Sequence, residues 1–255
     1  MTLNASQMNN FGSNGFLVFP SLYSDTDILI ISDWLDKLSK SDGPDVEIAT
    51  YFESSPITGE SVLVRAEYLL GDHNKKITDI LINDKVVKVL TQLLNDEPVL
   101  FKEKANFKLP GCRSDLLHQD QAAGWGMYSD YFVTVLIAID ENRLDNAAVS
   151  FRRANDHVLK LRGPEWEVLS HEEPPFSPES NYQVVEAEPG DAIFFDCYVP
   201  HGSPANKSSA ARRNLYLTFN RSSDGDFRMA YYTDKWQNYP PNTRDQARNK
   251  DTFKV

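Results

Sequence analysis

The sequence contains few cysteines. Its 255 residues include only two, Cys112 and Cys197. Small disulfide-stapled domains are rich in cysteine, and one pair in a chain of this length does not make such a framework. We therefore expect two free thiols, which are typical of proteins in a reducing compartment such as the cytoplasm.

Long apolar runs are missing as well. No stretch approaches the roughly 18 consecutive apolar residues that a membrane-spanning helix needs. The opening residues, MTLNASQMNNFGSNGF, lack the basic segment followed by an apolar one that marks a secretory signal peptide. The sequence therefore predicts neither a membrane span nor a signal peptide.

Positive charge is scarce relative to negative charge. The chain has 26 Lys and Arg residues against 37 Asp and Glu residues, a formal net charge of -11. Sequence-independent binding to nucleic acid or to an anionic membrane needs a basic surface, so we expect neither partner. A small anionic ligand is not excluded, because a few cations in a pocket outweigh a global field that is screened beyond about 10 Å.

The first 95 residues carry mostly helical patterns. Residues 16–19, FLVF, predict a short strand that ends at Pro20. Ser24 or Asp25 can cap a helix after it. The apolar residues of this helix recur at helical spacing: Ile28, Ile31, Trp34 and Leu38.

The pattern changes from helical to β-rich along the chain. Residues 60–70 alternate like a strand, and residues 74–96 predict one or two helices that end near Asn95. Beyond them, six short runs are rich in β-forming residues and are separated by turn residues: 98–109, 131–140, 147–151, 181–188, 191–200 and 214–222.

This order of elements predicts a mainly β fold with flanking helices, in which a sandwich or barrel has helices packed on one face. We expect one domain over residues 1–255, with a helix-rich part (1–95) packed on a β core (96–255). The stretch from Arg162 to Asn181 is rich in Pro, Glu and Ser. It is either a lid over a site or a plain surface insertion.

Histidine is also rare, and two of the five histidines suggest a metal site. His118 and Asp120 lie two residues apart, so on a strand both side chains point to the same face and can reach one ion. His201 follows the strong strand pattern of residues 193–198 and can supply a third ligand. Two imidazoles and one carboxylate on one face of a metal form the facial triad of non-haem Fe(II) oxygenases. The alternatives are structural histidines or a zinc hydrolase site.

Two adjacent arginines, Arg212 and Arg213, follow His201 by eleven and twelve residues. A guanidinium in a buried site grips a carboxylate through two parallel hydrogen bonds. The alternative is a solvated pair of charges at the start of a strand.

The sequence resembles the phytanoyl-CoA dioxygenase family of Fe(II)- and 2-oxoglutarate-dependent oxygenases. The resemblance is carried by FGSNGFLVFPSLYSD, KANFKLPG ahead of LLHQD, FVTVLIAID, and EPGDAIFFDCYVPHGSPANKSSAARRNLYLTFN. It implies a double-stranded β-helix core, also called a jelly roll or cupin-like fold. It also implies Fe(II) as cofactor and 2-oxoglutarate and O2 as co-substrates.

The resemblance also implies roles for individual residues. His118, Asp120 and His201 would hold iron. Arg212 would pair with the distal carboxylate of 2-oxoglutarate, with Ser203 nearby. Four further residues are placed at the co-substrate: Gln119, Lys104, Arg65 and Asn106. Two of these, Lys104 and Arg65, have the alternative of being exposed strand charges.

The chain departs from the family pattern in DNAAVSFRRANDH. Ala147 replaces the usual glycine there, and Arg152 and Arg153 occupy the region of the usual proline turn. This departure leaves the metal ligands unchanged and affects the loop shape and the substrate contacts there. The acid of the triad is a true aspartate, Asp120, which favours hydroxylation over halogenation.

The segments FRMAYYTDKWQNYPP and HQDQAAGW are similar to family members that hydroxylate 2-aminoethylphosphonate at the carbon next to phosphorus, giving 2-amino-1-hydroxyethylphosphonate. We expect a small zwitterionic substrate of this kind, touched by Gln121, Trp125, Tyr128 and Tyr131. Further candidates near the mouth are Lys102, Lys108, Arg113, Arg152, Arg153, Tyr231, Tyr232, Asp234 and Lys235.

Three alternatives to this substrate and activity stay open. The same hydroxylase chemistry could act on an amino acid, a betaine or a natural-product intermediate. The chain could instead be a catalytically silent jelly-roll binding protein. The third alternative is the zinc or other metal hydrolase.

Overall fold

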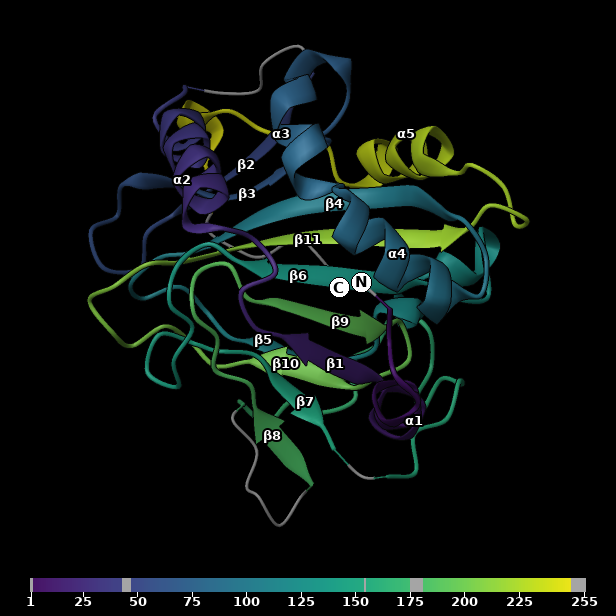
Figure 1. Cartoon of the computed structure of the whole chain (residues 1–255). Coiled ribbons are helices and arrows are strands. Elements are labelled where there is room, and N and C mark those ends of the chain that lie inside the picture. The colour runs from purple at the N-terminus through teal and green to yellow at the C-terminus, as the bar shows by residue number, and fades with distance from the viewer. Residues whose placement is uncertain (1, 43–46, 154, 175–180, 249–255) are drawn as a thin grey trace.

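The computed structural model describes residues 2–42, 47–153, 155–174 and 181–248. Two antiparallel sheets form its centre (Figure 1). In spatial order, the large sheet contains β1 (Phe16–Phe19), β9 (Ala192–Asp196), β6 (Val133–Ala138), β11 (Arg212–Arg221), β4 (Pro98–Lys108), β3 (Ser61–Glu67) and β2 (Ala49–Ser54). The small sheet contains β5 (Asp115–His118), β10 (His201–Ser203), β7 (Ser150–Arg152) and β8 (Tyr182–Val184).

The two sheets pack against each other through apolar side chains. Phe16 of β1 stacks on Phe151 of β7, with ring centroids 4.9 Å apart, and Phe195 of β9 joins them. This arrangement confirms the prediction of a mainly β fold with a jelly-roll core.

Helices cover one face of the large sheet (Figure 1). They are α2 (Asp25–Ser39), α3 (Lys75–Leu81) and α4 (Asp84–Leu94), while α1 (Ala5–Asn14) lies beside β1 and α5 (Arg228–Asn238) lies along β4. Within the described residues, no helix is long and apolar enough to cross a membrane.

The helix boundaries follow local capping chemistry. Ser24 is the residue that caps α2: its side chain accepts a hydrogen bond from the backbone N–H of Asp27, and the Asp27 carboxylate accepts one from the Ser24 N–H. The pattern after residue 74 forms two helices, α3 and α4. Asn95 ends the second in a left-handed conformation (φ 53°), as expected for an Asn helix cap.

Strand β4 positions much of the interior because its side chains alternate between two environments. Ala105 and Phe107 belong to the apolar core under the helices. Lys104, Asn106 and Lys108 point the other way, toward the small sheet, where Lys108 bonds Ser203 of β10. The sheet therefore presents a polar, basic row to the interior of the jelly roll.

The burial of α2 can be tested on two leucines of the same helix. Leu35 is fully buried, whereas Leu29 is 65% exposed. Leu35→Ala should lower the free energy of unfolding by about 2–5 kcal/mol, because it leaves a cavity in the core. The matched control Leu29→Ala should change it by less than about 0.5 kcal/mol. Urea unfolding followed by circular dichroism measures both, and equal losses would contradict the packing described here.

Candidate active site

The two predicted histidine ligands are brought together by strand pairing. His118 is the last residue of β5 and His201 is the first residue of β10, and the two lie opposite each other in the antiparallel ladder. Residues directly opposite in such a ladder have side chains in contact. The imidazole centroids are accordingly 4.4 Å apart.

Asp120 lies just beyond the end of β5, at the start of a short 3-10 helix (Asp120–Ala123). Gln119 between them keeps an extended backbone (φ -116°, ψ 132°), so the alternation of a strand continues to Asp120. Asp120 Oδ1 lies 3.7 Å from His118 Nε2 and 3.9 Å from His201 Nε2. The three ligand atoms all lie within 4.8 Å of one another, a geometry in which they could hold one metal ion.

Both imidazoles are oriented by backbone carbonyls. His118 Nδ1 lies 2.7 Å from the Leu116 carbonyl oxygen, and His201 Nδ1 lies 3.0 Å from that of Val199. Hydrogen bonds of this kind place the proton on Nδ1 and leave the Nε2 lone pair for a metal. Both Nε2 atoms face Asp120.

The charge states of the group suit metal binding. Burial alone would raise the pKa of Asp120, but its interactions with His118, His201 and Lys104 hold it well below its usual range. Burial, together with the neighbouring His118, lowers the pKa of His201 to about 4. At neutral pH the site therefore offers an ionised carboxylate and a neutral His201 imidazole, as a facial triad requires.

A cavity of about 410 Å³ opens beside both histidines. Its wall includes three residues that the resemblance placed at the co-substrate: Arg65, Lys104 and Asn106. The Lys104 ammonium lies 5.0 Å from the centroid of the Tyr216 ring, and Asn106 Oδ1 is buried without a donor. Lys104 and Arg65 therefore lie in the cavity wall rather than at an exposed edge. Their contact with a co-substrate stays a prediction.

The loop after residue 160 covers β5, which carries His118, and the short 3-10 helix that begins at Asp120. Trp166 N–H donates to the Ala122 carbonyl and Leu169 N–H donates to the Leu117 carbonyl, each at 2.7 Å. Trp166 and His171 line the cavity. Residues 175–180 of the predicted lid segment lie outside the described residues, and opening of this loop stays a prediction.

Gln119 holds this loop to the site. Its side-chain oxygen accepts from the Arg162 N–H at 2.7 Å, and its amide nitrogen donates to the carbonyls of Lys160 and Tyr198. Gln119 does not line the cavity. In the structure Gln119 links the segment that carries His118 and Asp120 to the loop after residue 160 and to the turn before His201.

The two adjacent arginines have different environments, because neighbouring residues on a strand point to opposite faces. Arg213 forms ion pairs with Asp140 (2.7 Å) and Asp36 (2.6 Å). Arg212 is only 1% exposed, and its Nε has no hydrogen-bond acceptor. Among the described residues no carboxylate lies within 4 Å of its guanidinium. A buried guanidinium without an anion is suited to a carboxylate ligand.

Ser203 belongs to a small polar cluster near Arg212. Lys108, which pairs with Arg212 across β4 and β11, donates to Asp115 Oδ2 at 2.8 Å and to Ser203 Oγ at 3.0 Å. Ser203 Oγ in turn donates to Asp115 Oδ2 at 2.9 Å. Burial alone would raise the pKa of Asp115, but the charges of Lys108 and Arg113 hold it well below its usual range. The cluster therefore stays charged.

The four side chains predicted to touch substrate do not line this cavity. Trp125 packs its ring against Phe101, and Tyr128 donates to Asp234 at 2.5 Å. Tyr131 lies under the Arg221 guanidinium, and the Gln121 amide donates to the Ser129 carbonyl. Their contact with substrate stays a prediction. The sequence did not indicate the cavity residues of the covering loop, because they follow no periodic pattern.

Comparisons with known proteins agree with this geometry. A model of the phytanoyl-CoA dioxygenase (PhyH) family matches residues 11–214, which include the three predicted ligands and Arg212. The chain is similar to the 2-aminoethylphosphonate dioxygenase of uncultured bacterium HF130_AEPn_1, with 30% identity over 236 residues, 92% of this chain and 88% of that protein. It is also similar to methylphosphonate hydroxylase of Gimesia maris, with 29% identity over 93% of this chain and 88% of that protein.

Solved structures show the same fold. EctD from S. alaskensis with bound Fe has a TM-score of 0.67 and 17% identity, and the match covers 87% of this chain and 78% of EctD. EctD with 2-oxoglutarate and 5-hydroxyectoine has a TM-score of 0.66 and 18% identity, and the match covers 87% of this chain and 77% of EctD.

The contrast between the two arginines gives a matched test. Arg212→Met should weaken 2-oxoglutarate binding at least tenfold, because it removes the buried guanidinium predicted to pair with the distal carboxylate. Arg213→Met should leave 2-oxoglutarate binding within about twofold and reduce stability instead, since it breaks the pairs with Asp140 and Asp36. Anaerobic titration calorimetry measures the first effect and thermal unfolding the second. Equal losses of affinity in both variants would contradict the assignment.

Proposed function

The chain belongs to the phytanoyl-CoA dioxygenase family, and we propose that it hydroxylates 2-aminoethylphosphonate at the carbon next to phosphorus. The reaction would use Fe(II), 2-oxoglutarate and O2, and would give 2-amino-1-hydroxyethylphosphonate. The proposal is supported by the ligand geometry, by the charge of the interior and by two relatives named for phosphonate substrates.

The donor set fits iron. His118, Asp120 and His201 would hold the ion through two imidazole Nε2 atoms and one carboxylate oxygen, on one face of the ion. When bound, iron with 2-oxoglutarate and O2 supplies the oxidising power that places one oxygen atom in a substrate C–H bond and the other in succinate, with loss of CO2.

The protein's own residues would orient the co-substrate. Arg212 would pair with the distal carboxylate of 2-oxoglutarate, and its orphaned Nε supports this role. Ser203 lies in the charged cluster with Lys108 and could add a hydrogen bond. The loop that Gln119 holds in place would exclude bulk water from the ligands.

The observation that carries the substrate class is an excess of buried basic side chains. In the described part of the chain, basic side chains around the ligands outnumber carboxylates: Arg65, Lys102, Lys104, Lys108, Arg212 and Lys235 against Glu67, Asp115 and Asp120. The two charges of Fe(II) and the two of 2-oxoglutarate cancel, so this excess remains after both have bound. A phosphonate dianion that also carries one ammonium has a net charge of -1 and offsets part of this excess of three, whereas an amino acid or a betaine brings no net negative charge.

The size of the cavity favours a small substrate. About 410 Å³ lies near the lower end of the range for small-molecule sites, and 2-oxoglutarate must share this space. A small phosphonate fits these dimensions better than a long acyl-CoA thioester.

Turnover distinguishes this function from its rivals. Fe(II)-reconstituted protein should form succinate from 2-oxoglutarate, and 2-aminoethylphosphonate should stimulate this at least tenfold, with a new hydroxyphosphonate signal in phosphorus NMR. Stimulation only by an amino acid, a betaine or another non-phosphonate would overturn the substrate. Iron binding without any succinate would favour a silent binding protein. Hydrolysis that needs no 2-oxoglutarate would favour the zinc enzyme.

The iron site can be tested separately. Asp120→Ala should abolish succinate formation, because it removes the carboxylate that completes the facial triad. Asp145→Ala, which removes an exposed carboxylate, is the matched control and should keep wild-type turnover. Iron content per chain, measured after gel filtration, should fall in the first variant only. Unchanged succinate formation by Asp120→Ala would falsify the assignment of the ligands.

A further inference from the structure

We propose that Lys102 of β4 and Lys235 of α5 form a clamp that holds the phosphonate group of the substrate. The aromatic rings of Trp125 and Tyr231 would form its walls. The inference rests on the proposed function for the class of substrate. It adds the residues that recognise this class and the helix that brings one of them to the site.

Both lysines lie against the same ring. The Lys102 ammonium is 5.3 Å and the Lys235 ammonium 5.8 Å from the centroid of the Tyr231 ring, and Lys102 is also 4.8 Å from that of Trp125. Aromatic faces partly compensate a buried ammonium but do not replace an anion. An anion bound beside this ring would therefore satisfy both ammonium groups, at the margin of the cavity rather than within its lining, which includes neither lysine.

Lys102 has no anionic partner in the described structure. It is 5% exposed, and no hydrogen bond or ion pair joins its ammonium to another described residue. Burial and the nearby charges of Lys104 and Lys235 lower its pKa well below the usual value. An unpaired buried amine is costly for the fold, and such groups cluster at functional sites.

A β-bulge aims Lys102 into this cluster. Strand β11 pairs Thr218 with Lys102 and Phe219 with Leu100, so Phe101 is an extra residue in β4. As a result Phe101 and Lys102 both contact the rings of Trp125 and Tyr231. Bulges of this kind often turn a side chain toward an active site.

Lys235 reaches the cluster through Glu67. Its ammonium lies 2.6 Å from Glu67 Oε1, and Arg65 lies 3.7 Å from the same oxygen, so one carboxylate is shared by two cations. Arg65 lines the cavity. The two cations Lys235 and Arg65 share the single carboxylate of Glu67, so the group adds net positive charge where the cavity wall meets α5.

The clamp and the predicted 2-oxoglutarate grip lie at different positions along β4, the first near its middle and the second at its end. Lys108, which pairs with Arg212, is six residues from Lys102, or roughly 20 Å along a strand. Lys104, between them, lines the cavity and acts electrostatically on Asp120. Two anions could therefore bind on either side of the metal ligands without competing for the same cations.

A buried donor adds to the clamp. Trp125 is 2% exposed and its indole Nε1 has no acceptor among the described residues. An indole N–H is a donor only, so a phosphonate oxygen would satisfy it. The sequence-based prediction that Trp125 contacts substrate therefore gains a specific atom.

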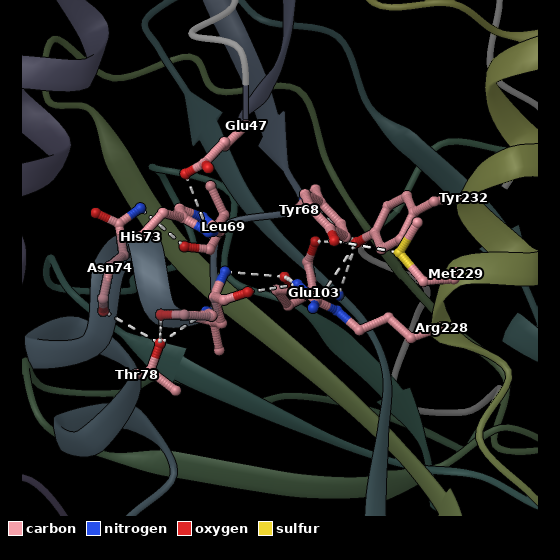
Figure 2. A network of polar contacts seen from close by, with 12 residues as sticks. Glu47, Tyr68, Leu69, His73, Asn74, Thr78, Glu103, Arg228, Met229 and Tyr232 are labelled. Atoms are coloured by element: carbon pink, nitrogen blue, oxygen red, sulfur yellow. Dashed lines mark hydrogen bonds and ion pairs between the residues drawn. The ribbon is translucent and has the colours of Figure 1, made fainter.

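Helix α5 is fixed to β4 by a buried network that Figure 2 shows. Arg228 donates to both oxygens of the Glu103 carboxylate and to the Leu70 carbonyl, and Tyr232 OH donates to the Glu103 carbonyl at 2.8 Å. Glu103 is the neighbour of Lys102 on β4 and points to the other face. The strand that carries one lysine of the clamp thus also anchors the helix that carries the other.

The test is a binding measurement without turnover. Protein loaded with Fe(II) and 2-oxoglutarate in the absence of O2 is titrated with 2-aminoethylphosphonate and with methylphosphonate. Lys102→Met and Lys235→Met should each weaken both phosphonates at least tenfold and leave the affinity for 2-oxoglutarate within about twofold. Lys76→Met removes an exposed lysine of α3 and should match wild type.

The outcomes separate the clamp from the proposed function. If the wild-type protein binds neither phosphonate, the proposed substrate is wrong and the clamp falls with it. If it binds them and both lysine variants bind equally well, the clamp alone is overturned. An equal loss of 2-oxoglutarate affinity would assign the lysines to the co-substrate instead. Circular dichroism of each variant confirms folding, and Lys102→Met removes an unpaired charge and should stay folded.

Discussion

The register of one short strand pair determines whether this protein has a metal site. His118 and His201 meet only because β5 and β10 place them opposite each other, and a slip of one residue would turn one of them to the other face. Strands of three or four residues do not hold register alone. Gly202 permits their close approach, since a Cβ there would lie 2.8 Å from the Asp115 carbonyl oxygen. Phe151 of β7 stacks on His201 from the other side.

The positive interior is the second constraint on this fold. Arg212 and Lys102 are buried without a carboxylate partner in the described structure. An apolar residue in either place would avoid the cost of burying an uncompensated basic group. Such charges are retained where a ligand neutralises them. Binding of anions to the folded state alone then stabilises the protein by mass action. The buried basic side chains, which cost stability without an anion, are thus the same feature that would select the ligands.

The sequence indicated the candidate ligands more readily than their surroundings. The spacing of His118 and Asp120 was informative because Gln119 keeps an extended backbone even though the strand has ended. The choice between Arg212 and Arg213 depends on which face of β11 meets the interior, and strand pairing decides this. Strands β5 and β10 were not predicted, because four and three residues carry no detectable period. The bulge at Phe101, which aims Lys102, leaves no signal in a single sequence.

The proposed residues for iron and co-substrate and those for substrate recognition come from successive parts of the chain. The family region ends at residue 214, after all three predicted ligands and Arg212, whereas α5 begins at Arg228. Relatives named for phosphonate substrates align over 236 and 238 residues, longer than that region, so their similarity extends beyond it. A jelly roll that keeps its iron ligands and co-substrate grip can change substrate by changing what packs beside Lys102 on β4. In this chain that element is α5. It would add Lys235 and Tyr231 to Lys102, the lysine beside the β-bulge in β4.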